Sequence, residues 1–314
     1  MCSSDLGSLE YFKGNTLGWE SISRTTPNLN GGARGIFFAG QNPGEVDTID
    51  YITISTLGNA TDFGNATDTR DEVSCCASRT RGVGGGGYDA GTDDKIDYVT
   101  FSSTGNAIDF GNLSVGRFGA GALSDQTRGI WAGGGTPSQF DVIDYITIAH
   151  SGNAVDFGNL IGATYIPGGC ASSTRGVFGG GNTSPAAINT IQYITISTTG
   201  NAADFGDLTA ARSGAGSSSN STRGLFYSGG SSNVIDYITI ATTGNATDFG
   251  DLTYATQEGG ACASSIRGIF GGGVPNTNTI NYVTILSTGN ATDFGDLTQA
   301  RKRLGSCSNA HGGL

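Results

Sequence analysis

The residues of this chain that could support acid–base chemistry are carboxylates and arginines, and they recur at regular intervals. Arg-Gly pairs occur six times, with steps of 47, 47, 47, 48 and 44 residues, and Asp recurs in Ile-Asp-Tyr and Asp-Phe-Gly triplets. Arginines and carboxylates are what a sialidase needs, but a catalytic site is one constellation and not six copies. The sequence therefore predicts structural pairs or backbone contacts, and no enzyme. The arginines concerned are Arg34, Arg81, Arg128, Arg175, Arg223 and Arg267.

Two repeats support this interpretation, because Gln192 and Asn281 replace the acid of the Ile-Asp-Tyr triplet. Amides suit hydrogen bonding and cannot transfer a proton as a carboxylate does. A hydrolase or oxidase acting on glycans stays open as an alternative. It would need a non-repeated cluster of acid, base and nucleophile, and the sequence displays none.

Histidine and cysteine do not form a metal-ligand pattern. His150 and His311 are the two histidines, and no spacing matches a zinc site. Four cysteines recur at equivalent positions, mostly five residues before an Arg-Gly pair, and Cys75 is one residue earlier; the four are Cys76, Cys170, Cys262 and Cys307. A thiol-lined channel that takes metal is one interpretation, and Cys as a small buried apolar residue is the favoured one. An acidic turn at residues 89–94 is preferred over a Ca²⁺ loop. We predict no metal and no cofactor.

The spacing of the repeats, about 47 residues, indicates which secondary-structure elements position these residues. In one repeat, residues 223–227 and 235–240 are β-branched and aromatic, as is typical of strands. Gly-Asn at 244–245 then predicts a tight turn before a returning strand at 246–252, and small residues fill 214–219. Four short strands in a unit of this length are typical of one β-propeller blade, whose strands we letter a to d from the axis outward.

The order of features resembles the kelch repeat, whose pattern is Arg, Gly-Gly, Tyr and Trp. In the fifth repeat these positions are Arg212, Gly229-Gly230, Tyr237 and Phe249, so Phe stands where kelch usually has Trp. The resemblance covers nearly the whole chain and implies an all-β, kelch-type propeller. The amino-acid sequence of the repeat is also similar to repeats in uncharacterised marine bacteriophage proteins. Neither resemblance specifies a function, because propellers host many activities.

The outer-strand aromatic residue is predicted to fill the wide gap between neighbouring blades. Burying one such ring contributes roughly 1.5–3 kcal/mol. The residues are Phe63, Phe110, Phe157, Phe205, Phe249 and Phe294, with Trp19 at the matching place near the N-terminus.

The ends of the chain suggest a blade count. Residues 1–6 match a translated sequencing adaptor and are left out of the fold. Residues 7–314 are predicted to form one domain: a half blade at 7–23, six repeats at about 24–300 and a partial blade at 301–314. Because the two ends supply complementary strands, a shared seventh blade is preferred. Six blades and a longer truncated array are the alternatives.

The charge and hydropathy of the chain argue against two classes of partner, nucleic acids and membranes. The net charge of −11 argues against nucleic-acid binding, which needs basic patches. No 18-residue apolar run is present, so no membrane insertion is predicted.

Sequence variation gathers in the b–c and d–a connections, which leave a blade on the same face, whereas the c–d turn barely changes. Loops on a rigid scaffold commonly carry binding. We therefore predict a non-catalytic binding or adhesion module, such as a virion-associated protein that recognises a cell-surface glycan or protein. A structural repeat of a longer fibre is a further alternative, and the localisation stays open between a virion and an extracellular site. The expected exposed contacts are Tyr88, Arg117, Phe140, Tyr165, Tyr254 and Arg303.

Overall fold

The computed structural model describes residues 8–12, 19–23 and 33–314, and it divides the chain into two compact units, residues 1–32 and 33–314. In the first unit, β1 (Ser8–Phe12) and β2 (Trp19–Ser23) form an antiparallel hairpin in which Phe12 lies opposite Trp19. The adaptor prediction for residues 1–6 falls outside the described residues.

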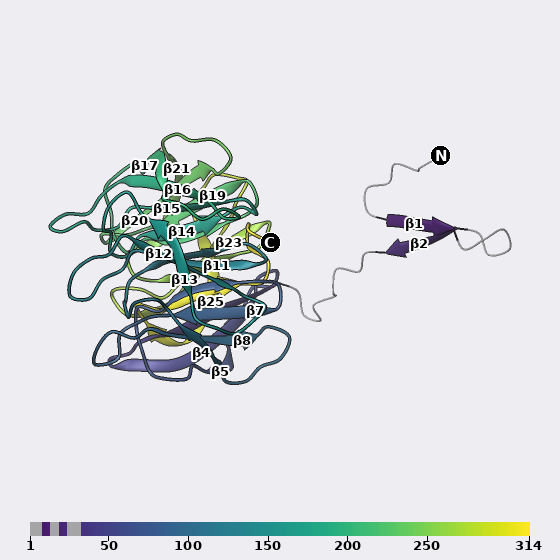
Figure 1. Ribbon diagram of the computed structural model, residues 1–314, viewed down its shortest axis with the longest axis horizontal. Coiled ribbons are helices and arrows are strands. Elements are labelled where there is room, and N and C mark those ends of the chain that lie inside the picture. Colours follow the sequence, from purple (N-terminus) through teal and green to yellow (C-terminus); the bar gives the residue numbers. More distant parts are fainter. Residues whose placement is uncertain (1–7, 13–18, 24–32) are drawn as a thin grey trace. The chain divides into compact units, whose positions relative to one another are not determined.

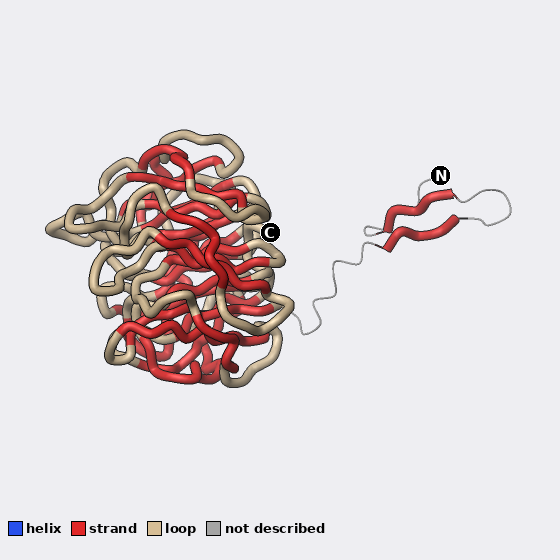
Figure 2. Tube along the Cα trace, turned by 60° about the horizontal axis from the view of Figure 1, so that its bottom comes forward, coloured by secondary structure: helices blue, strands red, loops and turns tan. Residues whose placement is uncertain are grey.

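The second unit consists of six four-stranded antiparallel sheets, which are the blades of a β-propeller (Figure 1). Its described residues contain strands and loops and no helix, as Figure 2 shows. The all-β propeller prediction is confirmed. Each strand run predicted in the fifth repeat is present, and the returning strand extends four residues further, to Thr256.

The blades are numbered along the chain, and their strands are given from the axis outward. Blade one contains β26 (Gly305–Ser308), β3 (Arg34–Gln41), β4 (Glu45–Thr53) and β5 (Thr61–Asn65). Blade two contains β6 (Ser74–Ala77), β7 (Arg81–Gly85), β8 (Lys95–Thr100) and β9 (Ile108–Asn112). Blade three contains β10 (Gly121–Ser124), β11 (Arg128–Ala132), β12 (Val142–Thr147) and β13 (Val155–Asn159).

The remaining blades follow the same plan. Blade four contains β14 (Gly168–Ala171), β15 (Arg175–Gly179), β16 (Thr190–Thr195) and β17 (Ala203–Asp207). Blade five contains β18 (Gly216–Ser219), β19 (Arg223–Tyr227), β20 (Ser232–Thr239) and β21 (Thr247–Thr256). Blade six contains β22 (Gly260–Ala263), β23 (Arg267–Gly271), β24 (Thr277–Thr284) and β25 (Thr292–Arg301).

The preferred count of seven blades is wrong, and the alternative of six is correct. The C-terminal strand β26 pairs with β3, so that Gly305 lies opposite Phe38 and Ser308 opposite Gly35. The strand therefore completes the blade that begins at Arg34. No described strand is left over for a blade shared with β1 and β2, and residues 33–314 close the ring with strands from both of their ends.

The arginines of the Arg-Gly pairs join neighbouring blades. Each guanidinium lies over the Tyr of strand c in its own blade, with 4.3–4.9 Å between the guanidinium carbon and the ring centroid. Each also donates a hydrogen bond of 2.6–2.9 Å to a backbone carbonyl just beyond strand c of the following blade. Arg267 of blade six reaches the Ile54 carbonyl of blade one, so these contacts close around the ring.

The outer aromatic rings lie where the sequence places them. The six phenylalanines are buried, with 2–3% of their surface exposed, and each ring packs edge-on against the Tyr of its own strand c at 5.8–6.1 Å between centroids. Each Tyr thus contacts both the outer Phe and the Arg of its own blade. The side chain of Trp19 lies outside the described residues.

A different arginine pairs with the acid of the Ile-Asp-Tyr triplet. Arg117 Nη2 lies 3.0 Å from Asp144 Oδ2, and both side chains are fully buried. Equivalent pairs are Arg70–Asp97, Arg212–Asp236 and Arg301–Asp50. In blades four and six, Thr164 and Thr256 replace the arginine, and Gln192 and Asn281 replace the acid of the same blade. The charge and its countercharge change together, as the high cost of an unpaired buried charge requires.

The c–d turn is fixed because it forms the joint between blades. Asn106 Oδ1 accepts a hydrogen bond of 3.1 Å from the Asn65 amide of the preceding blade, and the other five Gly-Asn turns make the same contact. The constancy of this turn therefore has a structural cause. The contrast between this constant turn and the variable loops is therefore no evidence that the variable loops have a function.

This joint gives a prediction that a pair of glycines can test. Gly111 has φ +147°, and a Cβ there would overlap the Gly152 carbonyl group of the next blade; Gly105 has φ +152° and open space around it. Both Gly→Ala variants strain the backbone by about 1–3 kcal/mol. Only Gly111→Ala also forces the blades apart, which should cost about 1–3 kcal/mol more. Equal losses in urea-induced unfolding would contradict the close approach.

Candidate functional site

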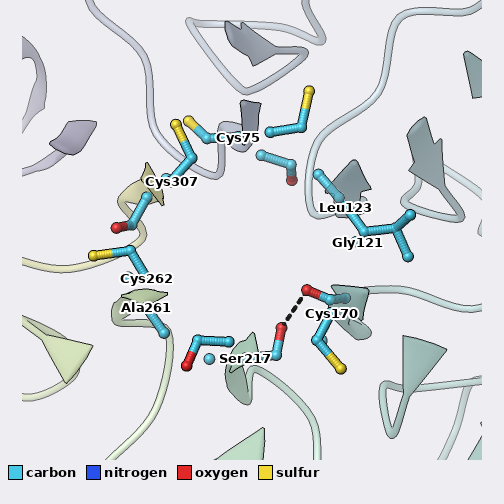
Figure 3. Close-up of a pocket in the computed structure, with 18 of the residues that line it drawn as sticks. Cys75, Gly121, Leu123, Cys170, Ser217, Ala261, Cys262 and Cys307 are labelled. Carbon is cyan, nitrogen blue, oxygen red and sulfur yellow. Dashed lines mark hydrogen bonds between the residues drawn. The ribbon is translucent and has the colours of Figure 1, made fainter. Parts of the chain in front are cut away.

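The six inner strands surround a channel with a cavity volume of about 140 Å³ (Figure 3). Small side chains line it because neighbouring inner strands converge on the axis. Ser74, Ser217 and Ser306 donate their hydroxyl groups to backbone carbonyls at 2.5–2.8 Å, which satisfies these hydroxyls within the protein.

The cysteines do not form a thiol-lined metal site. The sulfur atoms of Cys170, Cys262 and Cys307 point away from the opening in Figure 3, into the packing between blades. Burial raises the pKa of the Cys170 and Cys262 thiols to about 12, so both stay protonated at neutral pH. All five cysteines of the described residues are free and buried, and no His, Cys, Asp and Glu side chains within that part of the chain are grouped to hold a metal ion.

The segment after β26 lies across the channel at the end where the a–b turns emerge. His311 Nε2 lies 3.0 Å from the Ala77 carbonyl oxygen, and Gly312 donates its amide to the Ser219 carbonyl at 2.8 Å. These contacts reach blades two and five from a strand of blade one. Burial lowers the pKa of His311 to about 4, so the imidazole is neutral at pH 7.

The opposite end of the channel opens on the face of the b–c and d–a connections. One residue from each d–a connection forms a closed circle, in which each backbone amide donates to the carbonyl of the preceding connection at 2.7–3.3 Å. We call this circle the mouth ring; its members are Glu72, Gly119, Ile166, Gly214, Glu258 and Arg303. All six have φ between +48° and +68°, a conformation that favours glycine.

Four members of the mouth ring carry side chains despite this strain, and three of those side chains are charged. Arg303 Nε lies 2.9 Å from Glu258 Oε2 and 3.4 Å from Glu72 Oε1, and Arg303 Nη1 lies 3.5 Å from Asp71 Oδ2. Tyr165 donates its hydroxyl to Glu72 from the connection that leads into blade four. The cluster spans four of the six d–a connections. Strained residues of this kind concentrate at functional sites.

An aromatic row leads outward from this cluster. The Phe118 ring packs edge-on between Tyr165 and Tyr88, with centroids 5.6 Å and 5.5 Å away. Tyr88 lies in the b–c connection of blade two and exposes 38% of its surface. The row therefore connects the mouth ring to the open surface.

Of the six predicted contacts, Tyr88 is exposed, whereas Tyr165 and Arg303 are half-buried at the mouth; Tyr88 is linked to Tyr165 through Phe118. Arg117 is fully buried in its ion pair with Asp144, so the prediction that it is exposed is wrong. Tyr254 is half-buried, and its hydroxyl lies 3.1 Å from the carbonyl oxygens of Gly272 and Thr279, so it is not exposed as predicted.

Phe140 is half-buried in the b–c connection of blade three, apart from the residues of the cluster. Tyr254, by contrast, makes the contacts with backbone carbonyls that the arginine of the buried Arg–Asp pair makes in other blades. Arg117, for example, donates to the Val142 carbonyl at 3.1 Å, and blade six has Thr256 in place of that arginine.

Sequence reasoning missed Asp71, Glu72, Phe118 and Glu258. A signal was present in the repeat itself, because the mouth-ring position is Gly or Ile in three repeats and charged in the other three. A departure from the repeat marks a residue that the shared fold does not require.

The comparisons with known proteins leave the family open. No family model matches the chain, and no curated protein matches it. Within the described part of the chain, no helix is both long and apolar enough to cross a membrane.

Proposed function

We propose that this protein is a non-catalytic binding module whose ligand approaches the face of the b–c and d–a connections. The observation that carries the proposal is the cluster at the mouth ring, where Glu72, Glu258, Arg303 and Tyr165 meet at the open end of the channel. These side chains belong to d–a connections whose sequences differ between repeats, whereas the four strands of each blade are nearly the same in every repeat. Tyr and Arg are also the residue types that dominate binding hot spots.

The kelch-like order of Arg, Gly-Gly, Tyr and an outer aromatic residue, and the similarity to marine bacteriophage repeats, belong to this proposal. The similarity to bacteriophage repeats is the reason for proposing a virion-associated adhesion module. The partner we propose is a cell-surface glycan or protein. The repeated arginines and carboxylates contribute to blade structure, so the proposal includes no catalytic step.

Cell-surface binding of the intact protein, measured together with a glycan array, tests the proposal. Tyr88→Ala removes the exposed end of the aromatic row and should weaken binding by more than about 1 kcal/mol if Tyr88 is a hot spot. Thr104→Ala and Thr243→Ala lie in exposed c–d turns on the opposite face and are the matched controls. They should leave binding unchanged.

Equal losses from the two faces would contradict the proposed binding face. Turnover of a bound glycan would favour the enzyme alternative. No binding to any cell or glycan would favour a structural repeat within a longer fibre.

A further inference from the structure

The mouth ring encloses a second cavity, of about 110 Å³, above the channel. Its walls are apolar and include Val73, Ala120, Pro167 and Leu304. Its charged groups are Glu72, Glu258 and Arg303, which all belong to the mouth ring. The cavity therefore combines an apolar sleeve with a charged rim, an arrangement that suits a ligand with a short apolar stem and a charged head.

The rim carries more negative than positive charge. Arg303 is the one cation in contact with Asp71, Glu72 and Glu258 among the described residues. With all groups ionised, three carboxylates face one guanidinium. The side chains of Asp71 and Glu72 are 2% and 8% exposed, so water compensates little of this excess.

Asp71 is the least satisfied member of the cluster. Within the described residues, neither of its buried carboxylate oxygens has a hydrogen-bond partner, and its nearest cation is Arg303 at 3.5 Å. A buried carboxylate normally accepts hydrogen bonds or pairs closely with a cation. Arg303 is thus shared among three carboxylates, so the rim of the cavity keeps an excess of negative charge that a second positive group could offset.

We propose that the mouth cavity binds an organic cation, a primary ammonium or guanidinium group, between Glu72 and Glu258, the two carboxylates that line it. The inference rests on the proposed function and names the chemical class of its ligand. Arg303 already occupies one part of the rim and shows how these carboxylates hold a guanidinium. The stem of the ligand lies against the apolar wall, and the Tyr165 hydroxyl, which donates to Glu72, lies beside the charged rim.

Protonation of Glu72 competes with the ligand. Burial raises the pKa of Glu72 to about 7, against the opposing effects of the Tyr165 hydrogen bond and of Arg303, while Asp71 and Glu258 raise it further. Burial also raises the pKa of Asp71. A protonated carboxyl group attracts a cation less, so affinity should increase as the pH rises from 6 to 8.

Two sources could supply the group: a lysine or arginine side chain of a protein, or the amine of an amino sugar. Titration calorimetry on the full chain at low ionic strength should therefore use n-butylammonium and butylguanidinium as minimal probes. N-α-acetyl-lysine methylamide and glucosamine distinguish the two sources. n-Butanol, butyrate and N-acetylglucosamine are the uncharged or anionic controls.

We expect the cationic probes to bind, the controls not to bind, and the affinity to fall at least fivefold in Glu258→Gln. Asp248→Asn removes the same charge from an exposed site on the outer strand of blade five and should change the affinity less than twofold. An equal loss of affinity in both variants would show that only the net charge of the protein matters, and would overturn the proposed site. Tighter binding of the neutral or anionic probes would overturn it as well.

The outcome also separates this inference from the proposed function. If the intact protein binds cells and Tyr88→Ala weakens that binding, but no cationic probe binds, then the ligand class is wrong and the binding face stands. If cationic probes bind and no cell or glycan is recognised, the cavity is a cation site and the adhesion proposal fails.

Discussion

Deleting residues 305–314 should prevent this protein from folding. The deletion removes β26, the inner strand of blade one, which pairs with β3 at Ile36, Phe37 and Phe38. It also removes the contacts of the following segment, including the 2.8 Å bond from the Gly312 amide to blade five. An open blade exposes the edge of β3 and buried aromatic surface. We expect a loss of about 5 kcal/mol or more, comparable with the whole stability of a typical domain.

The measurement is thermal and urea-induced unfolding of the truncated chain, with a matched deletion at the other end. Removing residues 1–23 should leave the unfolding midpoint of the ring unchanged, because residues 33–314 already supply four strands to every blade. Since the shorter chain is expected to be unfolded, a synthetic peptide of residues 305–314 should restore the fold when added. An unchanged midpoint after deletion of 305–314 would show that β26 does not close the ring.

Replacing Arg117 by Ala should cost about 3–5 kcal/mol, because it leaves a buried charge without its partner. Asp144 would keep its 2.7 Å hydrogen bond from the Ser114 hydroxyl but lose the guanidinium at 3.0 Å. The carbonyls of Val142 and Trp131 would lose a donor as well. Urea-induced unfolding measures this loss directly.

The chain itself supplies the compensating change. In blade four, Thr164 stands with Gln192, whose Oε1 accepts a 2.8 Å bond from the Ile161 amide without any charge. The double variant Arg117→Thr with Asp144→Gln should therefore be more stable than either single variant. Additive losses in this cycle, or a loss below about 1 kcal/mol for Arg117→Ala, would contradict a coupled buried pair. A role as a surface contact would instead lower affinity without affecting stability.

The strands and the aromatic packing could be predicted from the sequence because they depend on local pattern. Ile235, Tyr237 and Ile238 are β-branched and aromatic residues typical of a strand, and Gly244 favours the turn that follows. Six copies of the same pattern leave few arrangements other than a propeller. The outer Phe249 then has one place to go, the gap between blades, and it lies there with 2% of its surface exposed.

The blade count and half of the candidate site depend on distant partners. The strand at residues 305–308 matches every other inner strand in residue type, so its sequence does not say which strand b it joins. Its pairing with β3 spans about 270 residues, as in the bond from Ser306 to the Ile36 carbonyl. Arg117 is similar: its burial is decided by Asp144, 27 residues away. The joint change of Thr164 with Gln192 was the available sign that this position is internal.

The contacts that join the blades have a consequence for how such a chain can evolve. Across each blade boundary, two recurrent side chains meet backbone atoms: the arginine of Arg-Gly donates to a carbonyl, and the turn asparagine accepts from an amide. The pair that must match in charge, such as Arg70 with Asp97, lies within one unit of sequence that starts after an outer strand. A tandem duplication of that unit would carry its matched pair with it, and its neighbours would accept it through backbone atoms that every blade possesses. Genes of this design can therefore gain, lose or exchange blades by recombination without leaving a buried charge unpaired.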